Sequence, residues 1–380
     1  MENKWILPLA LSLFIAVLSL AAAAKPVLPP VFILGDSTAD VGTNNFLPGS
    51  MARADFPHNG IDFPRTSKPT GRFSNGLNSA DFLAQHFGYK RSPSPYLSFK
   101  TTSLQKKKFN GINFASGGSG LLDLTGQTML TLMKFGTGNV PFSASFKDQK
   151  NVISLTEQIQ QFSSVKNNLT ALMGAVATEK FLKESLIFIS IGSNDLFGYY
   201  HSKSSIPKEK FLCSLELAYE NHLKTLYNLG ARKFGIISVA PIGCCPSQRI
   251  FNATGGCLEE LNEYAVTFHS KLDTLLCKLS TKYEGFKYSL GNSYEMTMNV
   301  IQNPLPFNFT QVEAACCGAG KLNAESYCTP NANLCPNRDQ YLFWDLFHPS
   351  QAASKLAAVT LYFGGPEYVS PINFAQLAEA

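Results

Sequence analysis

The chain has 380 residues, a length that allows either two domains or one α/β domain with insertions. Lys and Arg together number 32 against 27 Asp and Glu, so the formal net charge is only +5. The one compact basic run, Lys106-Lys107-Lys108, has no interleaved aromatic residues and is typical of a solvated loop. The sequence therefore gives no support for nucleic-acid binding.

Residues 1–24 predict a secretory signal peptide. Lys4 is followed by an apolar run from Trp5 to Leu20, and Ala22 and Ala24 match the small-x-small pattern that precedes a cleavage site. A membrane anchor is the alternative, but the apolar run is shorter than the ~20 residues of a spanning helix and contains Pro8. We expect export, cleavage near Ala24 and no membrane span in the mature chain.

Short apolar runs then alternate with stretches of helical period. The apolar runs predict buried strands at residues 31–34, 112–115, 186–191, 234–239 and 286–290. Helical patterns cover residues 80–87, 211–229, 258–283 and 350–363, the last with Ser350 as its N-cap. In the second helix, one face is predicted to carry Leu215, Ala218, His222, Leu226 and Leu229.

This alternation predicts one parallel sheet covered by helices on both faces. No internal repeat and no Ser/Gly-rich linker is present, so we expect a single domain over residues 25–380. Gly49–Thr70 and Gly126–Lys150 are expected to be loop insertions. In such sheets the binding crevice lies beyond the carboxyl ends of the strands, which directs attention to residues 35–37, 115–120 and 192–195.

His348 is the best candidate for a general base among the six histidines. Asp345 precedes it by three residues, and that offset lets the carboxylate accept a hydrogen bond from Nδ1. Nε2 is then free to take a proton from a hydroxyl, and Pro349 restricts the backbone of His348. A locally satisfied surface pair is the alternative explanation of an Asp-x-x-His spacing.

Ser37 lies where a nucleophile would be placed, directly after the first strand. The Gly-x-Ser-x-Gly elbow is absent, and a helix N-cap is the alternative role for this serine. Candidate donors to an oxyanion are the backbone N–H groups of Gly117 or Gly118 and the side-chain amide of Asn194. Tight-turn residues are the alternative reading of all three.

The cysteines and sequons fit an oxidising compartment. Bridges are expected for most of a group in the second half of the chain: Cys244, Cys257, Cys316, Cys317, Cys328 and Cys335. Zinc is the alternative, but no Cys-x-x-Cys pair is present, and the odd total of nine leaves at least one thiol unpaired within the chain. The glycosylation sequons are at Asn168, Asn252 and Asn308.

Together these motifs resemble the GDSL-type lipases and esterases of plants, members of the SGNH hydrolase superfamily. The resemblance covers essentially the whole mature chain. It rests on five blocks in order: Phe32–Ser37 with Asp40–Asn45, Pro69–Gly76, Gly111–Gly118, Ile191–Asp195 and Phe343–Pro349. The one visible departure is Thr38, which replaces the Leu of the name-giving motif.

The resemblance implies a three-layer, flavodoxin-like α/β sandwich with a parallel central sheet. It assigns Ser37, His348 and Asp345 as the catalytic set, and Ser37, Gly117 and Asn194 as the oxyanion hole, without metal or cofactor. The expected protein is a secreted ester hydrolase of the apoplast or cell wall, acting on a small-molecule or lipid ester. An acyltransferase that builds extracellular polyester and a non-catalytic binding protein are the alternatives. The sequence indicates no oligomeric state.

Overall fold

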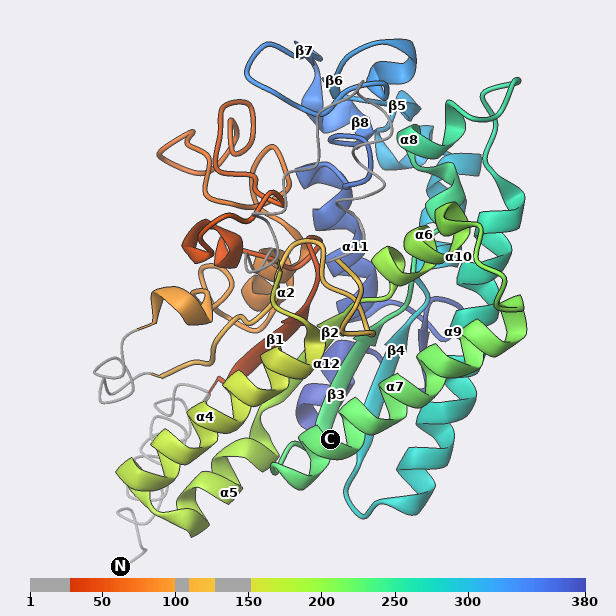
Figure 1. The fold of residues 1–380 in the computed structure, drawn as a ribbon. Helices are drawn as coiled ribbons and strands as arrows, with labels where there is room; N and C mark the ends of the chain where they lie inside the picture. Colours follow the sequence, from red (N-terminus) through yellow and green to blue (C-terminus); the bar gives the residue numbers. More distant parts are fainter. Residues whose placement is uncertain (1–27, 100–108, 127–151) are drawn as a thin grey trace, which may run out of the picture.

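The computed structural model describes residues 28–99, 109–126 and 152–380 (Figure 1). The predicted signal peptide lies outside this range, as do the basic run at 106–108 and all but the first residue of the 126–150 insertion. In the part of the chain that is described, no helix combines the length and apolar character needed to cross a membrane.

The central sheet has five strands in the order β1-β2-β3-β4-β9. Four of them are parallel: β1 (Val31–Gly35), β2 (Leu186–Ser190), β3 (Lys233–Ile237) and β4 (Lys287–Gly291). The fifth, β9 (Val369–Ser370), pairs antiparallel with β4. The parallel strands lie close to the predicted apolar runs, whereas the antiparallel edge strand was not predicted.

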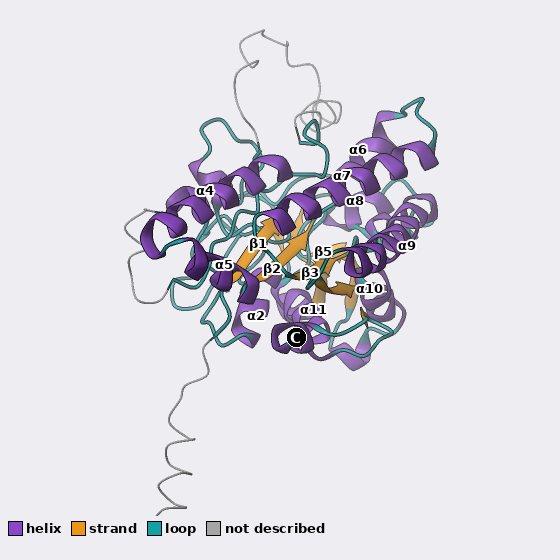
Figure 2. Cartoon of the chain, turned by 90° about the horizontal axis from the view of Figure 1, so that it is seen from below, coloured by secondary structure: helices purple, strands orange, loops and turns teal. Residues whose placement is uncertain are grey.

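Helices cover both faces of this sheet, which confirms the predicted three-layer α/β architecture (Figure 2). One face carries α4 (Leu155–Met173), α7 (Lys208–Asn228) and α9 (Glu259–Lys282). The other carries α2 (Ser79–His86), α11 (Gln351–Phe363) and α12 (Phe374–Glu379). Strand β1 serves both layers, because Phe32 and Leu34 belong to the first core and Val31 and Ile33 to the second.

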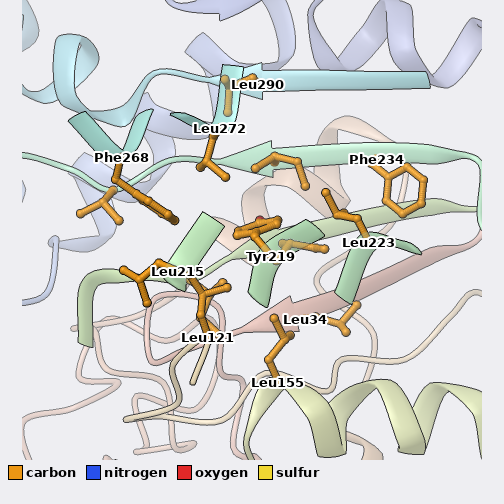
Figure 3. Close-up of a cluster of buried hydrophobic side chains, with 14 of the residues drawn as sticks. Leu34, Leu121, Leu155, Leu215, Tyr219, Leu223, Phe234, Phe268, Leu272 and Leu290 are labelled. Carbon is orange, nitrogen blue, oxygen red and sulfur yellow. The ribbon is translucent and has the colours of Figure 1, made fainter. Parts of the chain in front are cut away.

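The first core is the larger of the two, and Figure 3 shows its centre. Leu215, Tyr219 and Leu223 of α7 lie there with Phe268 of α9 and Phe234 of β3, all buried. The predicted face of this helix was right for Leu215 and Leu226, which are buried. It was wrong for Ala218, His222 and Leu229, which are only half-buried. The buried residues of α7 are Phe211, Leu212, Leu215, Tyr219, Leu223 and Leu226.

Residues 112–115 were predicted as a strand, but they pair with β1 only through one bridge, between Ile33 and Asn113. Backbone hydrogen bonds join Ile33 N–H to Ile112 O at 3.1 Å and Phe114 N–H to Ile33 O at 2.7 Å. The Asn113 side chain accepts the N–H of Ala115 at 2.9 Å, and beyond it Ser116 N–H donates to Gly35 O at 3.0 Å. Regular pairing is interrupted at Gly35, whose N–H donates to the Gln158 side chain. The segment still lies along β1 and extends the sheet at that edge.

Several helices were not predicted. The first is α4, which begins at a capping box between Ser154 and Glu157. The others are α5 (Ala175–Glu184), α6 (Ser193–Ser202), the short α8 (Pro246–Arg249), α10 (Ser293–Gln302) and α12. The 49–70 insertion contains no helix or strand, as predicted.

A separate segment joined by disulfides lies beyond one end of the central sheet (Figure 1). Here β5 (Gln311–Ala315) runs parallel to β8 (Tyr341–Phe343), and β6 (Cys317–Gly318) pairs antiparallel with β7 (Asn333–Leu334). The bridges are Cys244–Cys257, Cys316–Cys335 and Cys317–Cys328. The disulfide prediction is confirmed for all six cysteines, and Cys213, Cys245 and Cys277 are free.

Candidate active site

Ser37 lies in a tight turn two residues beyond the end of β1. Gly35 has φ 150°, and a methyl group there would lie 2.3 Å from Ser190 O, so glycine allows β1 and β2 to approach closely. Oδ1 of buried Asp36 accepts the N–H of Thr38 at 3.0 Å and its hydroxyl at 2.8 Å. Burial raises the pKa of Asp36. These bonds close the turn around half-buried Ser37.

Thr38 also connects this turn to the neighbouring strand. Its hydroxyl lies 2.9 Å from Oγ of Ser190, at the end of β2. The same side chain lines a cavity of about 20 Å³ between the sheet and α2. Thr38 thus makes two side-chain hydrogen bonds that a leucine could not make.

His348 faces Ser37 across 311 positions of sequence. Its Nε2 lies 2.7 Å from Ser37 Oγ, and its Nδ1 lies 2.8 and 2.9 Å from the two carboxylate oxygens of Asp345. Oδ1 of Asp345 also accepts the backbone N–H groups of Phe347 and His348 at 3.0 and 2.9 Å. Since an ionised carboxylate only accepts hydrogen bonds, Nδ1 carries the imidazole proton and Nε2 accepts from the Ser37 hydroxyl.

Asn194 lies in the first turn of α6, directly after β2, and not in an irregular turn. Its side chain is buried, and its amide nitrogen donates to Ser119 O at 2.8 Å. Among the described residues, no acceptor takes the second amide hydrogen. The helix thus brings a fixed amide donor to the carboxyl end of the sheet.

The two candidate glycines differ in their hydrogen bonds. The N–H of Gly117 donates to Oδ2 of Asp40 at 2.9 Å, so this predicted oxyanion donor already has an acceptor. The N–H of Gly118 has no acceptor among the described residues, and Gly118 is half-buried, with φ 84°. A positive φ of this size favours glycine at that position.

Two buried carboxylates hold the segment that contains these glycines. Oδ1 of Asp40 accepts the N–H groups of Gly42 and Thr43, both at 2.7 Å, while its Oδ2 holds Gly117. At the other end, Asp195 accepts the N–H groups of Leu121 and Leu122 at 2.8 and 3.1 Å. Burial raises the pKa of each carboxyl to about 6, although the hydrogen bonds that it accepts lower the pKa.

Sequence reasoning assigned no role to either carboxylate. Both lie inside motif blocks: Asp40 follows Ser37 by three residues, and Asp195 follows Asn194 directly. That position was the one feature of the sequence that could have marked them as functional. Their role as hydrogen-bond acceptors could not be inferred from the sequence. The N–H of Gly117 lies more than 70 positions from Asp40, and the N–H of Leu121 lies more than 70 positions from Asp195.

The three sequons lie at different depths. Asn168 on α4 and Asn308 are exposed. Asn252 is half-buried, and its amide nitrogen donates to Cys257 O at 3.1 Å. Within the described ranges, no group of three or more His, Cys, Asp or Glu side chains is arranged to hold a metal ion.

The chain is similar to known proteins over most of its length. The family model of GDSL-like lipase/acylhydrolase matches residues 31–360. The chain is 36% identical to GDSL esterase/lipase At5g55050 of Arabidopsis thaliana, with 92% of this chain and 90% of the relative covered. It is 33% identical to GDSL esterase/lipase LTL1 of the same plant, with 96% and 94% covered. The chain belongs to the GDSL-like lipase/acylhydrolase family.

Proposed function

We propose that this protein hydrolyses carboxylic esters, with Ser37 as nucleophile, His348 as general base and Asp345 as the residue that orients His348. The observation that carries the proposal is the 2.7 Å contact between Ser37 Oγ and His348 Nε2, together with the carboxylate of Asp345 on Nδ1. The names of the relatives, esterase/lipase, support the same class of substrate.

The reaction has two steps. Ser37 Oγ attacks the ester carbonyl carbon while His348 Nε2 takes its proton, and His348 then gives that proton to the departing alcohol. Water next attacks the acyl-enzyme, and His348 again takes and returns a proton, so that Ser37 and the carboxylic acid are released. Asp345 stabilises the imidazolium in both steps without taking its proton.

Three donors are proposed for the oxyanion: the N–H of Ser37, the second amide hydrogen of Asn194 and a glycine N–H. For the glycine we favour Gly118, since the N–H of Gly117 already donates to Asp40. Donors fixed before the reaction are effective because they need not reorganise as charge develops on the carbonyl oxygen.

Export and a lipid or acyl ester as substrate are part of the proposal. Three disulfides suit an oxidising compartment such as the apoplast or cell wall. Exposed Asn168 and Asn308 are better placed for a glycan than Asn252, whose amide nitrogen is hydrogen bonded. Mass spectrometry of the exported protein should find residue 25 at the N-terminus and glycan mass on one or more of these asparagines.

Labelling with a fluorophosphonate tests the nucleophile. The wild-type protein should be labelled at Ser37, and Ser37→Ala should lose labelling and about 10³-fold or more of its ester turnover. Ser164→Ala on exposed α4 is the matched control and should behave as wild type. A folded Ser37→Ala variant that keeps near-normal turnover would contradict the proposal.

Transfer of the acyl group to an added alcohol in preference to water would identify an acyltransferase.

A further inference from the structure

The segment 69–77 contains a motif block to which the reaction assigns no role. It passes close to the nucleophile loop: Gly71 has φ 91°, and a methyl group there would lie 2.6 Å from Gly42 Cα. The next residue, Arg72, forms two hydrogen bonds to the carboxylate of Asp81 at 2.6 and 2.8 Å. Both side chains are almost fully buried, so this ion pair fixes the segment against α2.

The other end of the segment is fastened to the helix that follows the base. The side-chain oxygen of Asn75 accepts the N–H of Gln351 at 2.7 Å, and the side-chain oxygen of Gln351 accepts the N–H of Leu77 at 2.7 Å. Gln351 is the first residue of α11, three positions after His348. The segment therefore bridges the nucleophile loop and the base.

Phe73 lies between these two anchors. Its ring centroid is 4.9 Å from that of His348, with an angle of 32° between the ring planes. A methyl group on Gly117 would lie 2.6 and 2.7 Å from Cε2 and Cζ of Phe73, so the ring also packs directly against Gly117. One aromatic side chain thus touches both the base and the glycine segment.

We infer that Phe73 is a positioning residue, which sets the plane of the His348 ring for proton transfer from Ser37. This inference rests on the proposed function. The Asp345 carboxylate holds one edge of the imidazole, at Nδ1, and leaves its faces unconstrained. A ring fixed through Arg72 and Asn75 covers one of these faces, prevents tilting and excludes water from that side.

Two substitutions separate positioning from volume filling. Phe73→Leu keeps most of the apolar volume but removes the flat ring, and Phe73→Ala removes both. Positioning predicts that kcat falls about tenfold in the first and about a hundredfold in the second, with KM nearly unchanged. Phe251→Leu, at an exposed phenylalanine, is the matched control and should have wild-type kinetics.

The acyl chain of the substrate separates positioning from substrate contact. The loss in kcat should be the same for acetyl and for longer acyl p-nitrophenyl esters, since the ring acts through His348. Full kcat in a stable Phe73→Leu variant, or a rise in KM that depends on acyl length, would overturn the inference. If Ser37→Ala is inactive, either of these results overturns only the role of Phe73, and the proposed ester hydrolysis stands. An active Ser37→Ala variant would overturn the proposed function itself. If Phe73→Ala does not fold, Phe73→Leu decides.

Discussion

Ser37 and His348 contact one another, yet different interactions hold the segments that carry them. The nucleophile side belongs to the central sheet, where β1 is hydrogen bonded to β2 and to residues 110–116. Gln158 of α4, fully buried, accepts the N–H of Gly35 at 2.8 Å and donates to its carbonyl at 2.9 Å. No disulfide of the described chain lies on this side.

The base side lies outside the central sheet and depends on covalent links. Cys316 and Cys317 donate their backbone N–H groups to Phe343 O and Trp344 O at 3.0 and 2.8 Å, directly before Asp345. Trp344 is fully buried among the four cysteines of two bridges, and its indole N–H donates to Asn59 at 3.0 Å. The central sheet and buried carboxylates thus place the nucleophile, whereas disulfides and loop contacts place the base.

The strongest test of the base side is Asp345→Asn. The amide cannot hold the Nδ1 proton as an ionised carboxylate does, so the tautomer that accepts from Ser37 is lost. We expect kcat to fall about 10³–10⁴-fold, with residual slow labelling by a fluorophosphonate. Stopped assays over hours measure this loss. If Asp345→Asn fails to fold, Asp345 has a structural role and not the proposed orienting role.

The matching test of the nucleophile side is Asn194→Ala. If the amide stabilises the oxyanion, kcat falls about 10²–10³-fold and KM changes little. The hydrogen bond to Ser119 is also lost, so a small fall in the thermal midpoint is expected. Turnover and melting should be measured on one preparation. A destabilised variant that is fully active per folded molecule would remove Asn194 from the site.

Removal of one bridge should affect the base side first. The double substitution of Cys316→Ser and Cys335→Ser opens a loop with a sequence separation of 19 and should cost about 3 kcal/mol of unfolding free energy. Activity should fall further than the folded fraction, because Phe343 and Trp344 lose fixed hydrogen-bond partners. Cys277→Ser, an exposed free thiol, is the control. Equal losses of activity and folded fraction would show that the bridge does not act on the base.

The smallest expected effect is a pH dependence on the nucleophile side. Burial raises the pKa of Asp40 to about 6, above its ordinary 3.8, so the folded protein binds more protons than the unfolded chain between these values. The Asp40 contribution to stability is therefore largest below about pH 4 and falls as the pH rises to about 6.

Asp40→Asn should flatten the fall of the thermal midpoint between pH 4.5 and 6.5. Some slope should remain, because burial also raises the pKa of Asp195 to about 6. Asp123→Asn, on the exposed surface of the same segment, is the matched control. An Asp40→Asn curve parallel to that of the wild type would show that Asp40 does not titrate in this range.

The sequence predicted the parallel strands because a strand buried on both faces is a continuous apolar run, as in Leu186–Ser190. A strand end and a three-residue spacing marked Ser37, Asp345 and His348 as candidates but left other roles open. The family resemblance joined the three into one catalytic set. The predicted face of α7 was wrong in part, because Ala218 and His222 were counted in place of Tyr219 and Leu223. Leu215 and Leu226 are buried as predicted. A helix with apolar residues on several sides does not reveal which stripe faces the sheet.

Other features depended on distances that sequence does not contain. Six cysteines allow 15 pairings, and only the fold brings Cys316 to Cys335 and Cys317 to Cys328. The acceptor of the Gly117 N–H could not be predicted either, since Asp40 reaches it through the packing of two loops. Phe73 gave no chemical signal, because a phenylalanine has no titratable group.

The long separation between Ser37 and His348 has a consequence for how the protein folds. Contacts between residues 311 positions apart form late, because closing so large a loop costs entropy before any contact repays it. A chain with only its first strands assembled has a serine without its base. Regain of ester turnover during refolding requires this long-range contact, so we expect turnover to return after helix content.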